Sequence, residues 1–295
     1  MNTIQSTLYG AKVLVHLLLG HTPVIPSRTT FNERLGIQDA AVPQNGEKVY
    51  LGVLTVGNKG HRYVAGDGGI ALTSVIDHLA NHASTYNPIP FALRRVDDDL
   101  NENERGKLCL RKEMTVSGVA CYGYYGYRMD IDPADVTVVM KKITVEDGVV
   151  TEEVYIPSTA DLYPPEVELP VKGAVTTTDV SLSVSCVIRV RLDEKDIAEF
   201  INAAKMMHNG DERYAIMSEF ALCTSADRVI SVPSTSGQVN FKEAIGTTAY
   251  SFSMDHKALY YNSQELTLDF DLGNQLPLLG TESIPTLETI PTTGQ

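Results

Sequence analysis

The chain lacks several features that would point to a particular class of protein. It has no Trp, and its 24 Lys and Arg side chains are outnumbered by 37 Asp and Glu, which gives a formal net charge of −13 over 295 residues. Phosphate contacts need clustered cations, so this composition disfavours a general nucleic-acid-binding protein. The acidic surface favours solubility, and two further interpretations stay open: repulsion of DNA, or docking on a basic partner.

Cysteine and long apolar runs are also scarce. The four cysteines are widely spaced and form no CxxC pair: Cys109, Cys121, Cys186 and Cys223. We therefore expect free, buried thiols of a cytosolic protein. The apolar run Val13–Leu19 is too short to cross a bilayer, and no small-residue cleavage site follows it convincingly. We expect assembly in the cytoplasm and no contact with a membrane.

No set of residues with catalytic or metal-binding spacing stands out. His78 and His82 are four apart, as zinc ligands on a helix can be, but the intervening Leu-Ala-Asn lacks the Glu of an HExxH motif. In the loop Asp97–Glu104, neither the glycine turn nor the closing Glu of a calcium loop is present in register, which favours a solvated acidic loop. The five glycines of Gly57–Gly69 match no phosphate-binding fingerprint, which favours a structural turn or assembly loop over an anion site. We predict that the protein is not an enzyme and has no cofactor or metal site. A single sequence does not exclude a pair of carboxylates that could hydrolyse glycosides.

Strand patterns are plentiful. In Ser181–Leu192 every even position is apolar, which predicts a strand with one buried face. The segment Val136–Pro157 has two β-prone runs around Asp147-Gly148, and Asp-Gly favours the positive φ angles of a tight hairpin turn. Further expected strands are 48–56, 90–96, 107–131, 214–223, 229–232, 249–254, 258–261 and 266–272.

Three segments have helical patterns. Ser6–Leu19 predicts a short helix capped by Ser6 or Thr7, with a buried strand as the alternative. Residues 71–83 and 194–208 predict amphipathic helices, the second capped by Asp193 and stopped by Gly210. The expected fold class is α+β, mostly antiparallel β-sheet with these two amphipathic helices packed on it and a projecting β-hairpin.

The domain organisation follows from these patterns. We expect residues 1–275 to form a single α+β body with a hairpin arm at about 136–157, and residues 276–295 to form an extended C-terminal arm rich in Pro and Thr. The alternative is two lobes, 1–135 and 158–275.

A dense aromatic patch lies in the expected strand 107–131. Tyr122, Tyr124, Tyr125 and Tyr127 could stack nucleic-acid bases, but such platforms accompany a basic groove, and only Arg111, Lys112 and Arg128 lie nearby in the sequence. We therefore favour core or subunit-contact tyrosines.

Three segments of the sequence resemble structural proteins of tailed bacteriophage particles. They are Pro90–Leu100, Arg105–Lys112 and Tyr122–Asp130, and Phe91, Arg94, Arg95, Asp99 and Leu100 carry the similarity. Arg213–Arg228 has a similar character. The resemblance covers about residues 57–135 and implies a virion subunit in the neck, tail or baseplate, with no catalytic residues.

These observations lead to one functional hypothesis. We expect an oligomeric ring or collar subunit at the phage neck or tail, a head–tail connection, found in the virion and assembled in the host cytoplasm. Its partners would be copies of itself and other virion proteins. DNA that passes through the ring would contact it without binding. The expected subunit-contact residues are Tyr122, Tyr124, Tyr125, Asp147, Pro277 and Pro285. The alternatives are a baseplate or minor capsid component, and, from another class, a soluble hydrolase or ligand-binding protein.

Overall fold

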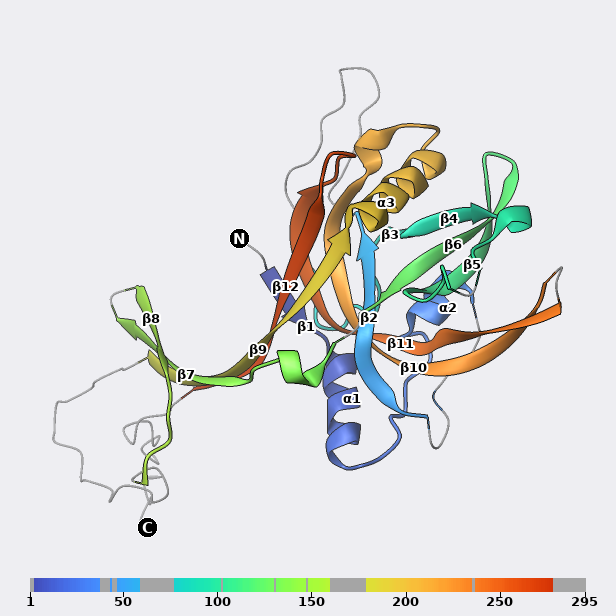
Figure 1. The fold of residues 1–295 in the computed structure, drawn as a ribbon. Coiled ribbons are helices and arrows are strands. Elements are labelled where there is room, and N and C mark those ends of the chain that lie inside the picture. Colours follow the sequence, from blue (N-terminus) through green and yellow to red (C-terminus); the bar gives the residue numbers. More distant parts are fainter. Residues whose placement is uncertain are drawn as a thin grey trace, which may run out of the picture. The chain divides into compact units, whose positions relative to one another are not determined.

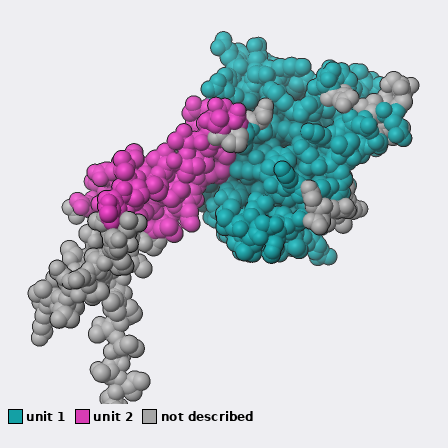
Figure 2. All heavy atoms as spheres, turned by 60° about the horizontal axis from the view of Figure 1, so that its bottom comes forward, with its two compact units in different colours: residues 1–131, 190–268 teal, residues 132–189, 269–295 magenta. Residues whose placement is uncertain are grey.

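The chain divides into two compact units, which we describe separately (Figures 1 and 2). Unit 1 consists of residues 1–131 and 190–268, and unit 2 of residues 132–189 and 269–295. The structure is a computed structural model, and it describes residues 3–37, 43, 47–58, 77–101, 103–129, 131–146, 148–159, 179–234 and 237–277. The chain passes between the units three times: between residues 131 and 132, within β9 (Asp179–Asp193) and within β12 (Glu265–Pro277).

Unit 1 is built on one antiparallel sheet, which has eight strands in the described residues. Its main order is β1 (Thr3–Ser6), β11 (Gly237–Ala258), β10 (Ile216–Ser234), β2 (Val49–Gly57), β6 (Val119–Arg128) and β4 (Ala92–Arg95). Two more strands lie beside this path: β3 (Pro88–Ile89) pairs with β2, and β5 (Leu108–Val116) pairs with β6. Antiparallel sheet therefore dominates, as the sequence pattern predicts.

Strands β10 and β11 are much longer than the sequence predicts. They pair antiparallel from Ile216↔Ala258 to Ser234↔Gly237, with three register shifts along the way. Each shift places an extra residue in one strand, which bends and twists the pair. The bulges interrupt the regular apolar alternation, and this explains why the sequence reads as the separate short strands 214–223, 229–232, 249–254 and 258–261.

The core of unit 1 lies between β5, β6, β10 and β11. A fully buried cluster includes Phe31, Leu110, Cys223 and Phe252. The backbone N–H of Leu110 on β5 donates to the carboxylate of Glu243 on β11, 2.5 Å away, so these two strands meet although they are not neighbours in the sheet order. The cysteines Cys109, Cys121 and Cys223 are free and buried in this unit, as expected from their spacing.

The helices begin and end where local signals place them. Helix α1 (Leu8–Leu18) is capped by the Thr7 side chain. Helix α3 (Glu194–Met207) has a capping box formed by Asp193 and Asp196. Both agree with the sequence pattern. The short 3₁₀ turns are η1 (Val96–Asp98), η2 (Pro133–Asp135) and η4 (Glu212–Tyr214).

Helix α2 (Phe31–Leu35) is short and lies in a segment rich in Pro, Thr, Asn and Gly. It has a capping box formed by Thr30 and Glu33, and it ends at Gly36 with φ 70°. These signals are present in the sequence as Thr-x-x-Glu followed by Gly, but five residues are too few to show helical periodicity.

The helix predicted over 71–83 is wrong in the part that the structure describes. Residues 77–83 form an irregular turn, and 71–76 lie outside the described residues. His78 is buried and its ring pairs with Glu219 of β10, whereas the apolar Leu79 is 62% exposed. A long-range polar pair therefore overrides the helical periodicity of this segment.

Unit 2 is built on strands of a second antiparallel sheet. Its order is β12–β9–β7–β8, with β7 at Val139–Glu146 and β8 at Val149–Val154. The predicted hairpin pairs from Lys141↔Val154 to Glu146↔Val149, and Gly148 has φ 78°. The hairpin is not an isolated ribbon, because β7 also pairs with β9 from Val139↔Ser185 to Val145↔Asp179.

The two units interleave in sequence, which differs from a single body of residues 1–275 or lobes at 1–135 and 158–275. Strands β10 and β11, from the second half of the chain, pair with β2 and β1 from the first half. Residues 276 and 277 end β12, and the rest of the expected arm, 278–295, lies outside the described residues.

Candidate functional site

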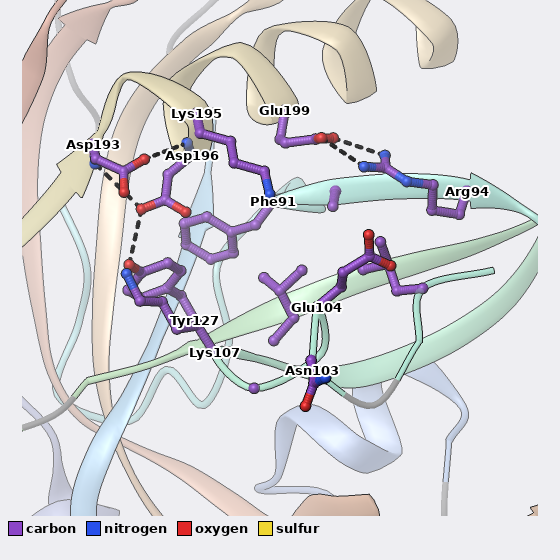
Figure 3. A pocket seen from close by; sticks show the side chains of 14 residues that line it. Phe91, Arg94, Asn103, Glu104, Lys107, Tyr127, Asp193, Lys195, Asp196 and Glu199 are labelled. Carbon is purple, nitrogen blue, oxygen red and sulfur yellow. Dashed lines mark hydrogen bonds and ion pairs between the residues drawn. The ribbon is translucent and has the colours of Figure 1, made fainter. Parts of the chain in front are cut away.

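A pocket of about 330 Å³ lies in unit 1 between β4, β6, the 100–108 segment and the first turns of α3 (Figure 3). Its floor is apolar, with Phe91, Leu100 and Leu108. Phe91 packs against Tyr127 with ring centroids 5.4 Å apart. The volume is at the lower end of the range for small-ligand sites.

The walls of the pocket are held by polar pairs between α3 and the sheet. Arg94 on β4 donates two hydrogen bonds to Glu199 on α3, at 2.7 and 2.5 Å, and this partner raises the pKa of the guanidinium. The Tyr127 hydroxyl donates to Asp196 at 2.9 Å, and burial raises the pKa of that hydroxyl. These bonds fix the first two turns of α3 over the sheet.

The chemistry available in the pocket is limited by these pairings. Glu199 and Asp196 are engaged by Arg94 and Tyr127, and Glu104 accepts the backbone N–H of Asn101 at 3.0 Å. The exposed Lys107 and Lys195 supply ammonium groups at the lining. The lining as a whole has three basic side chains, Arg94, Lys107 and Lys195, and four acidic ones, Glu104, Asp193, Asp196 and Glu199. Acid–base catalysis needs an unengaged carboxylate or His near the substrate.

Asp99 lies at the centre of a packed polar network beside this pocket. The Asp99 carboxylate accepts hydrogen bonds from Arg105, from Arg111 at 2.7 Å and from the Tyr124 hydroxyl at 2.6 Å. The guanidinium of Arg111 lies 3.3 Å from the ring centroid of Tyr122. Asp99, Arg105, Arg111 and Tyr124, which come from three separate segments of the sequence, therefore meet in space. The expected solvated loop 97–104 is wrong at Asp99, whose side chain is only 13% exposed.

A second polar cluster is buried against β10. The imidazole of His78 lies 2.5 Å from a Glu219 carboxylate oxygen through Nε2 and 3.1 Å from the His82 ring through Nδ1, and it stacks on Phe252. The two histidines thus bond to each other and do not converge on a common point. Within the described residues, no three His, Cys, Asp or Glu side chains are grouped as a metal site requires.

Cys109 is fully buried on β5. Burial raises the pKa of its thiol well above the ordinary value. A reactive cysteine needs the opposite shift, because the thiolate is the nucleophile.

The sheet of unit 2 buries few of its described side chains. Among the described side chains of this unit, only Ile188 and Phe270 are buried. Apolar side chains more than a third exposed are Val138, Met140, Val145, Val149, Val150, Val154, Ile156, Val184, Val187 and Leu276. These side chains lie on both faces of the sheet: Val145, Val150 and Val154 share one face, and Met140, Val149 and Val184 share the other. A sheet normally buries at least one face, so this exposure marks the sheet as a candidate interaction surface.

One side of this sheet continues a buried row. The even residues of β9 are apolar throughout, and Ile188, Val190 and Leu192 are 6%, 4% and 0% exposed, whereas Val184 is 41% exposed. Met140 of β7 lies directly opposite Val184 and is also 41% exposed. We call this side, with the even residues of β7 and β9 and the odd residues of β8, the β9 face.

The predicted subunit-contact residues differ in how far they are buried and in whether the structure describes them. Tyr124 and Tyr125 are 1% and 4% exposed in the chain's own core, so the core interpretation of the aromatic patch applies to them. Tyr122 is half-buried under Arg111. Asp147 and Pro285 lie outside the described residues, and Pro277 is placed only as the last residue of β12. Sequence reasoning missed Met140 and Val184, although the even apolar row of β9 was the signal.

The architecture is that of an α+β protein dominated by antiparallel sheet. The chain belongs to DUF7208, a family of unknown function, and the family model matches residues 1–286. Neither the curated proteins nor the solved structures contain a match to the chain. None of the helices in the described part of the chain has the length and apolar content needed to span a bilayer.

Proposed function

We propose that this protein is a homo-oligomeric structural subunit that assembles through the sheet of unit 2. The observation that carries the proposal is the exposure of apolar side chains on β7, β8 and β9. Burying such side chains in a neighbouring molecule removes them from water at about 25 cal/mol per Å². In this proposal the hairpin of β7 and β8 is a projecting arm.

The setting we propose is the virion of a tailed bacteriophage, as a ring or collar subunit at the neck or tail, with a baseplate or minor capsid position as the alternative. Support comes from the phage-like segments, which form the Asp99 network in unit 1. The net charge of −13 also suits a channel through which DNA passes without sticking. A map of charge on the assembled ring tests this last point, and a basic lumen contradicts it.

Self-association is tested by sedimentation velocity and native mass spectrometry over a concentration series. We expect the wild type to form a discrete oligomer and the Met140→Glu/Val184→Lys variant to stay at the 32.2 kDa of one chain. The two new side chains lie directly opposite each other on β7 and β9, so they can pair and preserve the sheet.

The matched control places the same pair elsewhere. Thr115→Glu/Ala120→Lys puts Glu and Lys at exposed, directly opposite positions of β5 and β6. This variant should assemble like the wild type. A wild type that remains monomeric at all concentrations overturns the proposal.

A second candidate function, ligand binding, is favoured by the pocket beside α3. Its apolar floor and the ammonium groups of Lys107 and Lys195 suit a small aromatic carboxylate. Ligand-observed NMR with a set of benzoates tests it. Binding that is lost in Lys107→Ala/Lys195→Ala supports this candidate, and the absence of binding removes it.

A further inference from the structure

Helix α1 has an apolar side that the described chain leaves uncovered. Its buried residues are Gly10 and Val13. Leu14, Val15 and Leu18 are 45%, 55% and 78% exposed. With the exposed Ala11 they occupy positions i, i+3, i+4 and i+7, which form one stripe along the helix. We call these four residues the α1 stripe.

The helix is fixed firmly enough to present this stripe. The N–H of Thr7 donates to the carbonyl of Tyr250 on β11 at 3.0 Å, and the Thr7 hydroxyl donates to the carbonyl of Ala249 at 2.5 Å. At Gly10 an added Cβ would lie 2.6 Å from the Cα of Tyr250, so the helix is in backbone contact with the strand. The stripe is therefore held outward by the packing of the opposite side.

From this geometry we infer that the α1 stripe of one copy docks on the β9 face of a neighbouring copy. The inference rests on the proposed function and names the two surfaces that meet. Such a contact is heterologous, because two different patches of the same chain are joined, and heterologous contacts build closed rings or open filaments.

The dimensions of the two surfaces agree. A helix of 11 residues is about 16 Å long at 1.5 Å per residue. The part of the β9 row that is not fully buried, from Val180 to Cys186, extends about 20 Å at 3.3 Å per residue. The α1 stripe can therefore lie along this row and contact most of its length.

The charges at the edges are complementary. Lys12 is exposed, and it is the only Lys or Arg in residues 1–27, which contain no Asp or Glu. On the β9 face, Glu153 of β8 lies directly opposite Lys142 of β7, Lys142 lies opposite Leu182 of β9, and Glu146 lies at the turn end of β7. A docked helix would bring its one cation to a face with an excess of carboxylates.

Two other occupants fit less well. Packing α1 against α1 of another copy would bring two Lys12 side chains to the same seam and leave the β9 face uncovered. A bilayer is disfavoured because the chain has a net charge of −13 and anionic lipid surfaces attract basic segments.

The test is complementation between two variants that cannot assemble alone. Leu14→Glu/Leu18→Lys breaks the α1 stripe with a Glu–Lys pair at i and i+4, which supports a helix. Met140→Glu/Val184→Lys breaks the β9 face. When the two are mixed, the intact sheet of the first can receive the intact helix of the second, and we expect a 1:1 pair with no larger species.

The outcomes separate the inference from the proposed function. If the wild type assembles but the mixture stays monomeric, or if the α1 variant assembles like the wild type, the inference is overturned and self-association stands. If the wild type does not assemble, the proposed function itself fails. Flotation of the wild type with phosphatidylcholine vesicles, lost in the α1 variant, would assign the stripe to lipid and also overturn the inference.

The helix variant has its own matched control. Asn202→Glu/Met206→Lys introduces the same pair at exposed positions of α3. It should leave the oligomer unchanged. Circular dichroism of each variant checks that the helices and sheets are retained.

Discussion

Asp99 holds two arginines in a partly enclosed site. Its carboxylate accepts from Arg105, Arg111 and Tyr124, and the side chains of the two arginines are 11% and 16% exposed. Removing one member of such a network leaves a buried charge without its counter-charge. The resulting loss of folding free energy is larger than the stability that an exposed ion pair contributes. The network therefore stabilises the 99–111 segment beside the pocket.

We expect Asp99→Asn to destabilise the fold by about 3 kcal/mol, because both guanidinium groups lose their counter-charge. Chemical denaturation measures this free energy of unfolding. The matched control is Asp97→Asn, which removes the pair with Arg95 whose side chains are 62% and 68% exposed. The control should be indistinguishable from the wild type, and equal effects of the two substitutions would contradict the account.

Glu243 makes stability depend on pH. It is 4% exposed, accepts the N–H groups of Leu110 and Ala244, and burial raises its pKa to about 7. Because the folded state holds this proton more tightly than the unfolded state, the contribution is full at pH values below the unfolded pKa near 4.5. It is lost as pH rises through about 7.

The wild type should therefore lose stability relative to Glu243→Gln between pH 4.5 and about 7, by up to roughly 3 kcal/mol. The amide can still accept the Leu110 N–H, so the variant keeps the hydrogen bond without the titration. Denaturation of both proteins at pH 5 and pH 8 gives the difference. If the difference in unfolding free energy between the wild type and Glu243→Gln does not change with pH, this role for Glu243 is excluded.

The sequence predicted the burial of single residues correctly where their neighbours in space are also their neighbours in the sequence. The burial of Cys109, Cys121 and Cys223 follows from the apolar strands around them. It failed for Asp99 and His78, because their partners Arg111 and Glu219 are supplied by other parts of the chain. Side chains paired over long sequence distances leave no local pattern.

At the scale of elements, caps and long alternating patterns predicted α1, α3 and β9, whereas bulges concealed the full length of β10 and β11. The packing of α1 on β11 also could not be predicted, because Gly10 reads as a poor helix residue in isolation. Its role becomes clear only where the helix meets the strand.

Gly10→Ala tests that packing. In an exposed helix this change adds about 1 kcal/mol of stability. Here the new Cβ would lie 2.6 Å from the Tyr250 Cα, so we expect a loss of about 1–3 kcal/mol as α1 shifts away from β11. Lys12→Ala, at an exposed position of the same helix, is the control and should change stability little. Stabilisation by Gly10→Ala would show that the helix is not held in this contact.

At the scale of the whole molecule, the fold class was predictable and the division into units was not. Period-two patterns indicate antiparallel sheet, but they do not say that β2 pairs with β10, or that the chain changes units within β9 and β12. The candidate surface was predicted only as the β7–β8 hairpin. The β9 face was missed because an apolar row in the sequence looks the same whether the chain itself or a partner covers it.

The central claim is that a neighbouring copy covers the β9 face when the chains associate. The reactivity of the Cys186 thiol measures this directly. Cys186 lies in the even row of β9 and is only partly buried, whereas Cys109, Cys121 and Cys223 are buried in unit 1. Burial raises the pKa of the Cys186 thiol, so it should react slowly but measurably with a maleimide.

The decisive measurement is the alkylation rate of Cys186, followed by mass spectrometry at a concentration where the chain is dilute and at one where it assembles. The account predicts a rate at least several-fold lower in the assembled sample, and no such change in the Met140→Glu/Val184→Lys variant. An equal rate for the wild type at both concentrations would contradict it.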